Sequence, residues 1–220
     1  MTPALLIFDF DGVLVDSEVL WSDALSIVLT RMDYPIGVDD CRRRFTGAMG
    51  SAVRALVEAD SGKPLPAEFE TAVRDEAYAL LSVDLQVVAG ADALLRSLEG
   101  QRCIASNSDL AWIDRGLRGA DLDAYFPAPQ RFSAEQVANG KPAPDVFVHA
   151  ASTMGVDPAA CIVVEDSIHG VTGARAAGMR VLGFTGASHT MDGHYDLLRQ
   201  AGVDAVFDDL TRLPDLLRML

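Results

Sequence analysis

A short apolar run near the start of the chain ends in two carboxylates and a glycine. The run is Leu5–Phe8, and Asp9-Phe10-Asp11-Gly12 follows it directly. Four consecutive apolar residues predict a strand buried on both faces, which is typical of a parallel sheet. Charges without partners are costly to bury, so a buried strand that ends in two of them indicates a cation or a substrate nearby. The run therefore predicts a reaction centre.

Apolar, β-rich runs alternate with helical patterns along most of the chain. The expected strands are Leu5–Phe8, Cys103–Ala105, Cys161–Val164, Val181–Phe184 and Ala205–Phe207. Helices are expected to begin near Asp92, Asp109, Asp145, Ile168, Tyr195 and Leu213. This alternation predicts an α/β fold with a Rossmann-like parallel sheet and helices on both faces, in which sites form beyond the carboxyl ends of the strands.

One segment interrupts this alternation. The segment shows helical periodicity without a strand pattern. The helical patterns are Val19–Met32, Ser51–Ala59 and Glu68–Leu81. We therefore expect an all-helical domain, residues 17–85, inserted after the first strand of an α/β core made of residues 1–16 and 86–220.

The composition argues against several classes of protein. A net charge of −14 at pH 7 repels nucleic acid and anionic membranes. No apolar run approaches the roughly 20 residues that span a bilayer, and the first basic residue is Arg31, so the charged start of a secretory signal is missing. Cys41, Cys103 and Cys161 are too scattered for a disulfide framework or a zinc site, and we expect them to be reduced packing residues. We expect a soluble, cytoplasmic protein without nucleic-acid or membrane partners. Its oligomeric state stays open, with a monomer as the default.

Four polar clusters follow the expected strands. They are Asp9 with Asp11, Ser106-Asn107-Ser108, Lys141 in a proline-rich loop, and Glu165-Asp166-Ser167. Each alone has a plainer explanation: a turn, a helix N-cap, a solvated lysine and a second N-cap. Because the carboxyl ends of parallel strands meet at one edge of a sheet, all four are expected to converge on one crevice. Their joint placement favours a functional site.

In order and character these clusters resemble the four motifs of the haloacid dehalogenase superfamily of phosphatases and phosphomutases. The helical insert resembles the cap of the β-phosphoglucomutase-like and sugar-phosphatase branch. The resemblance covers essentially the whole chain, strongly in the core and weakly in the cap. True dehalogenases lack the second carboxylate of the first motif, so Asp11 favours phosphoryl transfer.

The resemblance implies a role for each cluster. Asp9 would attack phosphorus and form an aspartyl-phosphate, and Asp11 would act as general acid and then general base. Ser106 and Asn107 would hold the phosphoryl oxygens. Lys141 would neutralise charge and tether Asp9.

A Mg²⁺ cofactor follows from the same pattern. The implied ligands are the Asp9 carboxylate, the Asp11 backbone carbonyl and Asp166, with Glu165 as an outer or alternative ligand. The charge balance also favours a metal, because three carboxylates and a phosphoryl group carry more negative charge than Lys141 can offset.

The cap departs from that of the mutases at two positions. Trp21 occupies the position of a mutase histidine, and the arginine that holds a second phosphate falls at or near Gly50, in a loop with Gly47. Arg74 and Tyr78, on the last cap helix, are candidate specificity residues together with Trp21 and Gly47. We expect a phosphatase for a sugar or sugar-acid phosphate. The alternatives are a phosphomutase of the β-phosphoglucomutase type and a catalytically inactive module that binds phosphometabolites.

The remaining polar side chains receive plainer interpretations. Arg54 is the nearest basic residue beyond Gly50, and Arg42–Arg44 is interpreted as a solvated helix face. The histidines show no ligand spacing and are interpreted as structural or surface residues, with His169 singled out for testing because it follows the fourth cluster. The four are His149, His169, His189 and His194. Tryptophans are expected to pack in the core, and Gly170, Gly173 and Gly178 to permit close helix packing.

Overall fold

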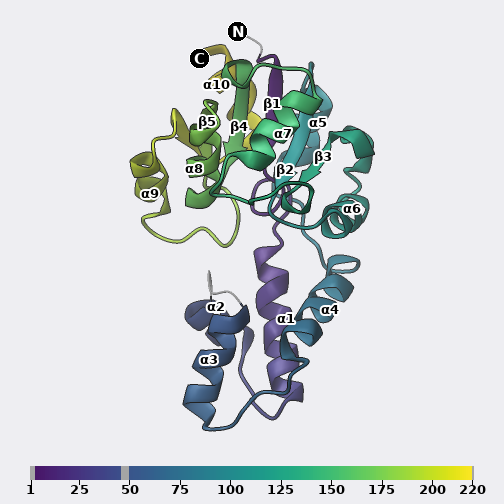
Figure 1. Cartoon of the computed structure of the whole chain (residues 1–220), viewed down its shortest axis with the longest axis vertical. Coiled ribbons are helices and arrows are strands. Elements are labelled where there is room, and N and C mark those ends of the chain that lie inside the picture. Colours follow the sequence, from purple (N-terminus) through teal and green to yellow (C-terminus); the bar gives the residue numbers. More distant parts are fainter. Residues whose placement is uncertain (1–2, 46–49, 220) are drawn as a thin grey trace. The chain divides into compact units, whose positions relative to one another are not determined.

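The computed structural model describes residues 3–45 and 50–219. The chain divides into two compact units, which are coloured by sequence in Figure 1. The larger unit comprises Met1–Asp16 and Gln86–Leu220, and the smaller unit is Ser17–Leu85.

The larger unit is built on a six-stranded parallel sheet in the order β3-β2-β1-β4-β5-β6. The strands are β1 (Leu5–Phe8), β2 (Arg102–Ser106), β3 (Arg131–Ser133), β4 (Cys161–Glu165), β5 (Arg180–Phe184) and β6 (Ala205–Phe207). Ile7 on β1 lies opposite Cys103 on β2 and Val163 on β4. This is the Rossmann order, in which the connections reverse direction beside β1 and ligands bind beyond the carboxyl ends of the strands.

Five of these strands confirm the sequence-based expectation, and β3 does not appear in it. Arg131–Ser133 is too short to show a periodic pattern, and its pairing with β2 is what makes it a strand. The edge strand β3 therefore forms through its pairing with β2, which a local sequence pattern does not report.

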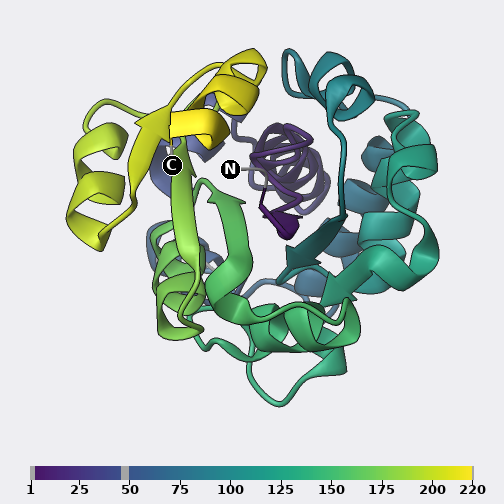
Figure 2. The same cartoon turned by 90° about the horizontal axis from the view of Figure 1, so that it is seen from above.

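Helices lie on both sides of this sheet, as Figure 2 shows. They are α5 (Ala91–Ser97), α6 (Leu110–Gly119), α7 (Asp145–Thr153), α8 (Ile168–Ala176), α9 (His194–Ala201) and α10 (Leu213–Met219). Short 3₁₀ turns lie at Asp123–Tyr125, Ala128–Gln130, Ala134–Gln136, Pro158–Ala160 and Leu210–Arg212. Each of these α-helices begins within one residue of its predicted start. Within the part of the chain that the structure describes, no helix is long and apolar enough to cross a bilayer.

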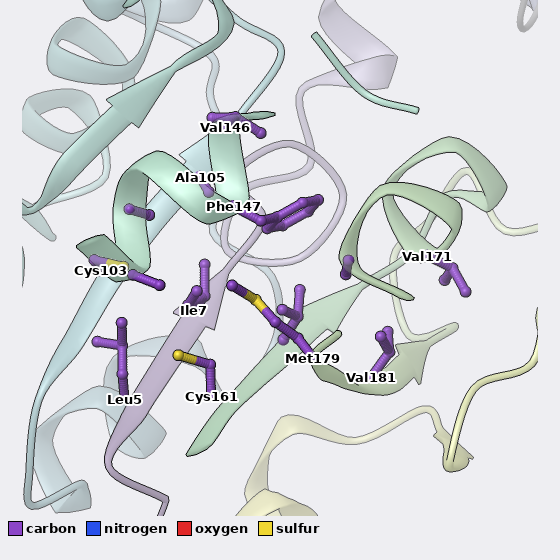
Figure 3. Close-up of a cluster of buried hydrophobic side chains, with 14 of the residues drawn as sticks. Leu5, Ile7, Cys103, Ala105, Val146, Phe147, Cys161, Val171, Met179 and Val181 are labelled. Atoms are coloured by element: carbon purple, nitrogen blue, oxygen red, sulfur yellow. The ribbon is translucent and has the colours of Figure 1, made fainter. Parts of the chain in front are cut away.

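Alternate side chains of the strands pack against α7, α8 and α9 on one face of the sheet (Figure 3). Ile7 at the centre is fully buried among Phe147, Val163 and their neighbours. Truncating such a residue to alanine costs about 2–5 kcal/mol. Cys103 and Cys161 lie in this cluster as free thiols, which confirms their interpretation as packing residues. This core fixes the strand ends that carry the polar clusters.

The smaller unit consists, in its described residues, of four α-helices and their connections. They are α1 (Glu18–Arg31), α2 (Val38–Phe45), α3 (Gly50–Ser61) and α4 (Phe69–Leu81). Its core joins Leu29, Val57 and Phe69 with Cys41 from α2. The hydrophobic periodicity did not show α2, because only Cys41 and Phe45 of its eight residues are buried. Arg42–Arg44 lies on its exposed side, as expected.

Candidate active site

Three acidic side chains meet at the carboxyl ends of β1 and β4. Asp9 follows β1, Glu165 ends β4, and Asp166 comes next. The two strands pair in register, with Phe8 opposite Val164, so the residues that follow them lie side by side. One carboxylate oxygen from each acid lies within 4.8 Å of the other two, and all three acids are buried. We call Asp9, Glu165 and Asp166 the acidic cluster.

Lys141 brings a positive charge into the acidic cluster. Its Nζ donates hydrogen bonds to Oδ1 of Asp9 at 2.7 Å and to Oε1 of Glu165 at 2.5 Å. Its side chain is only 3% exposed, which excludes a solvated loop lysine. Asn107 holds the backbone of this loop, because its Oδ1 accepts from the Lys141 N–H at 2.8 Å and its Nδ2 donates to the Lys141 carbonyl at 3.1 Å. Asn107 of the second polar cluster therefore positions Lys141, which is the third.

The acidic cluster has more carboxylates than the single ammonium group of Lys141 can neutralise. Burial raises the pKa of Asp9 well above its usual range, and the charge of Glu165 raises it further, against the opposing effect of Lys141. Burial also raises the pKa of Asp166. Burial lowers the pKa of Lys141, but attraction to Asp9 and Glu165 outweighs it and leaves that pKa raised. Three buried carboxylates around one ammonium group form an oxygen donor set that fits a hard divalent cation such as Mg²⁺.

Both oxygens of Glu165 have protein donors. Oε1 accepts from Lys141, and Oε2 accepts from the backbone N–H and the hydroxyl of Ser167, each at 3.0 Å. Ser167 also caps α8, since its Oγ accepts from the Gly170 N–H at 3.0 Å. A Cβ on Gly170 would lie 1.7 Å from Oε1 of Glu165. Gly170 is therefore required for close packing, as expected, and the group it accommodates is this carboxylate.

Side chains from the end of β2 and from the segment after it donate hydrogen bonds to Asp11. Its Oδ1 accepts from Nε1 of Trp112 at 2.8 Å. Its Oδ2 accepts from the hydroxyl of Ser108 at 2.5 Å and, more weakly, from that of Ser106 at 3.4 Å. Trp112 lies in the first turn of α6, and Asp109 caps this turn by accepting from the Trp112 N–H at 2.7 Å. Trp112 is buried, as expected of a core tryptophan, but its bond to Asp11 is a role that the sequence did not reveal.

Two histidines contact Asp166, one from the loop between β5 and α9 and one from the first position of α9. Nε2 of His189 lies 3.1 Å from Oδ2 of Asp166, and Nε2 of His194 donates to the Asp166 carbonyl at 2.6 Å. His169, which the sequence singled out, is instead exposed on α8. Sequence reasoning missed His189 and His194 because they follow the fourth cluster by more than 20 positions and share no spacing with it.

Asp16 anchors the same loop. Its Oδ2 accepts from the Ser188 N–H at 2.9 Å, and its Oδ1 lies 3.9 Å from Nδ1 of His189. Burial raises the pKa of Asp16, but the neighbouring imidazole of His189 and the hydrogen bonding from Ser188 outweigh burial and leave the pKa below its ordinary value. The ionised carboxylate therefore fixes the backbone that carries His189.

The predicted cap residues belong to the smaller unit. Trp21 lies on α1, and Arg74 and Tyr78 lie on α4. The Arg74 side chain is 59% exposed. Gly47 falls outside the described residues. The specificity roles of these residues stay predictions.

Arg54 is bound within the smaller unit. Its guanidinium donates to both carboxylate oxygens of Glu70, at 2.7 and 2.6 Å, and to the carbonyls of Leu65 and Pro66, both at 2.8 Å. Arg54 thus fastens the loop between α3 and α4 to both helices.

Comparison with known proteins gives consistent matches over most of the chain. Residues 3–178 match the family described as haloacid dehalogenase-like hydrolases. The 6-phosphogluconate phosphatase of Escherichia coli (strain K12) is 31% identical over 183 residues, which are 83% of this chain and 82% of that protein. A conserved haloacid dehalogenase-like protein of Agrobacterium tumefaciens str. C58 has a solved structure that superposes with a TM-score of 0.85 at 41% identity, over 98% of each chain. A putative β-phosphoglucomutase of Thermotoga maritima superposes with a TM-score of 0.82 at 26% identity, over 98% of this chain and 99% of that one.

Proposed function

The chain belongs to the haloacid dehalogenase-like hydrolases, and from this premise we propose that it is a Mg²⁺-dependent phosphatase that hydrolyses a sugar or sugar-acid phosphate through an aspartyl-phosphate. The observation that carries the proposal is the pair of bonds from Lys141 Nζ to Asp9 and Glu165, beside Asp166. The similarity to a 6-phosphogluconate phosphatase supports the substrate class.

The buried acids suit a hard cation. The carboxylates of Asp9 and Asp166 and the backbone carbonyl of Asp11 would hold Mg²⁺, which when bound neutralises charge on the phosphoryl group. Glu165 is the less suitable ligand, because Lys141 and Ser167 already donate to its two oxygens. Its main task in this proposal is to hold the lysine beside Asp9.

The phosphoryl group is bound from the side of β2. The hydroxyl of Ser106 would exchange its weak 3.4 Å bond to Asp11 for one to a phosphoryl oxygen. The backbone N–H groups of Ser106 and Asn107 would donate to the other oxygens, together with Lys141. The Asn107 side chain takes a different part, because both its polar atoms bond the Lys141 backbone. It positions the lysine rather than the substrate.

The reaction then proceeds in two displacements at phosphorus. A carboxylate oxygen of Asp9 forms a bond to phosphorus as the bond to the ester oxygen breaks, and Asp11 gives its proton to that leaving oxygen. In the second step Asp11 takes a proton from water, the water oxygen bonds to phosphorus, and the bond to Asp9 breaks. Inorganic phosphate leaves and Asp9 is restored.

In this proposal the smaller unit, Ser17–Leu85, is the cap, and Trp21, Gly47 and Arg74 are its specificity residues. A phosphomutase would also need a cap group that grips a second phosphate. The nearest arginine after Gly50 does not suit that task, since Glu70 and two carbonyls already hold the Arg54 guanidinium. The contacts of Arg54 therefore favour hydrolysis over isomerisation.

A panel of phosphorylated metabolites with the purified protein tests the proposal. Phosphate release is expected from sugar and sugar-acid phosphates with Mg²⁺, and no release with EDTA. Phosphorus NMR separates the alternatives, because a mutase forms a positional isomer faster than inorganic phosphate. Failure to cleave even p-nitrophenyl phosphate would favour a binding module instead.

A further inference from the structure

The residue that links the loop between β5 and α9 to the acidic cluster is His189. Its imidazole Nε2 hydrogen-bonds Oδ2 of Asp166, at 3.1 Å. None of the four polar clusters that resemble the family motifs includes His189. We propose that His189 is a positioning residue of the metal site, which fixes the orientation of the Asp166 carboxylate and thereby sets the affinity for Mg²⁺. This inference rests on the proposed metal site.

The backbone around His189 is held on both sides. Ser188 donates its N–H to Asp16, and His194 at the start of α9 donates to the carbonyl of Asp166. The imidazole is therefore presented from a loop whose two ends are fastened to the same unit. A donor fixed in this way holds a carboxylate in one orientation at little further cost in side-chain entropy.

The turn after Asp11 leaves room for this contact. Gly12 has a φ of +80°, and a Cβ there would lie 2.1 Å from Oδ2 of Asp166 and 2.8 Å from Cε1 of His189. The histidine and the carboxylate thus pack together against a position that only glycine fits. Oδ2 of Asp166, the oxygen that His189 contacts, therefore occupies the space that a side chain at position 12 would need.

The physical reason for an effect on affinity is general. A carboxylate that binds a metal loses rotational freedom, and a hydrogen-bond partner that orients it beforehand lowers that cost. Such outer partners typically change metal affinity by about 10–100-fold when they are removed. His189 is such a hydrogen-bond partner of the Asp166 carboxylate.

The test compares variants of the full chain by isothermal titration with MgCl₂ in the absence of substrate. His189→Gln keeps an N–H donor at nearly the reach of Nε2, whereas His189→Asn carries the same amide on a side chain one methylene shorter. We expect His189→Gln to bind Mg²⁺ within about 3-fold of the wild type and His189→Asn to bind about 10–100-fold more weakly. His169→Ala, which removes an exposed histidine near the same cluster, is the control and is expected to bind as the wild type does.

A second readout separates positioning from chemistry. The Mg²⁺ concentration for half-maximal turnover of p-nitrophenyl phosphate should rise in His189→Asn by the same factor as the dissociation constant, while kcat at saturating Mg²⁺ stays within about 3-fold. Thermal melting in EDTA checks that both variants are folded. If His189→Asn is not folded, His189→Ala takes its place as the variant without a donor in reach.

Equal Mg²⁺ affinity in the wild type and His189→Asn would overturn the inference and leave the proposed phosphatase intact. An equal loss of Mg²⁺ affinity in His189→Gln and His189→Asn would also overturn it, because the affinity would then not depend on whether the side-chain donor reaches Asp166. A wild-type protein that cleaves phosphate esters without binding Mg²⁺ would instead remove the metal site on which both proposals depend.

Discussion

Trp112 donates its indole N–H to Oδ1 of Asp11 across 2.8 Å, which joins the first turn of α6 to the residue proposed as general acid. Trp112 is 2% exposed, so water does not compete for this bond. Ser108 and Ser106 donate to the other carboxylate oxygen. The end of β2 and the segment that follows it therefore hold the Asp11 carboxylate.

The first prediction concerns this bond. Trp112→Phe keeps a buried aromatic ring but removes the donor, and a hydrogen bond to the carboxylate that forms as Asp11 gives up its proton contributes about 1.5–3 kcal/mol. We expect kcat/KM for a sugar phosphate to fall by about 10-fold or more. The loss should be smaller for p-nitrophenyl phosphate, whose leaving group needs little protonation.

The loss in Trp112→Phe is compared with that in Asp11→Asn, which removes the proposed general acid and is expected to lose about 10²–10⁴ in rate. Equal losses for the two substrates in Trp112→Phe, with phosphorylation shown to limit the rate of both, would mean that Trp112 acts only through packing. Melting curves of the variant report the packing contribution separately.

The second prediction concerns Asp9. Asp9→Asn is nearly isosteric, but it removes the nucleophile and a proposed metal ligand together, so turnover should fall by more than about 1,000-fold. The fold should persist, because the variant also removes a buried negative charge beside Glu165. Steady-state kinetics and circular dichroism measure the two effects. Retention of a tenth of wild-type kcat would exclude the covalent mechanism.

The third prediction concerns Gly170. A methyl group there meets the Glu165 carboxylate, so Gly170→Ala must displace either the acid or the first turn of α8. We expect a loss of about 1–3 kcal/mol in the free energy of unfolding, measured with urea, together with a loss of activity. Gly37→Ala is the control, since its added Cβ meets nothing nearer than the 4.0 Å to Asp40. A Gly170→Ala variant as stable and active as the wild type would show that Glu165 is not tightly placed.

The fourth prediction concerns acid stability. The hydrogen bond from Arg54 lowers the pKa of Glu70 from its ordinary 4.5 to about 2. A depressed pKa means that the pair stabilises the folded protein above pH 4.5 and that this contribution is lost as the pH falls toward 2. We expect the wild type to melt at a higher temperature than Glu70→Gln at pH 6, with the difference narrowing between pH 5 and pH 3. A difference that does not change with pH would mean that Arg54 and Glu70 contribute through packing alone.

Elements with local signals could be predicted from the sequence alone. The Leu5–Phe8 strand, the acids that follow it and the capped starts of α6 and α8 depend on residues within a few positions of one another. Periodicity and capping chemistry report such neighbours directly, which is why five strands and the helix starts of the core were predicted correctly. The resemblance to a family then grouped the four polar clusters before any contact between them was known.

Tertiary structure decided the contacts between distant parts of the chain. Trp112 and Asp11 are 101 positions apart, and Lys141 and Asp9 are 132 apart. The strand β3 exists because it pairs with β2, and α2 because two of its residues reach the core of the smaller unit. A lone histidine or tryptophan carries no periodic signal for a partner so far away. The positions of His189 on Asp166 and of Trp112 on Asp11 were set only when the parallel strands brought their carboxyl ends, and the loops beyond them, to one edge of the sheet.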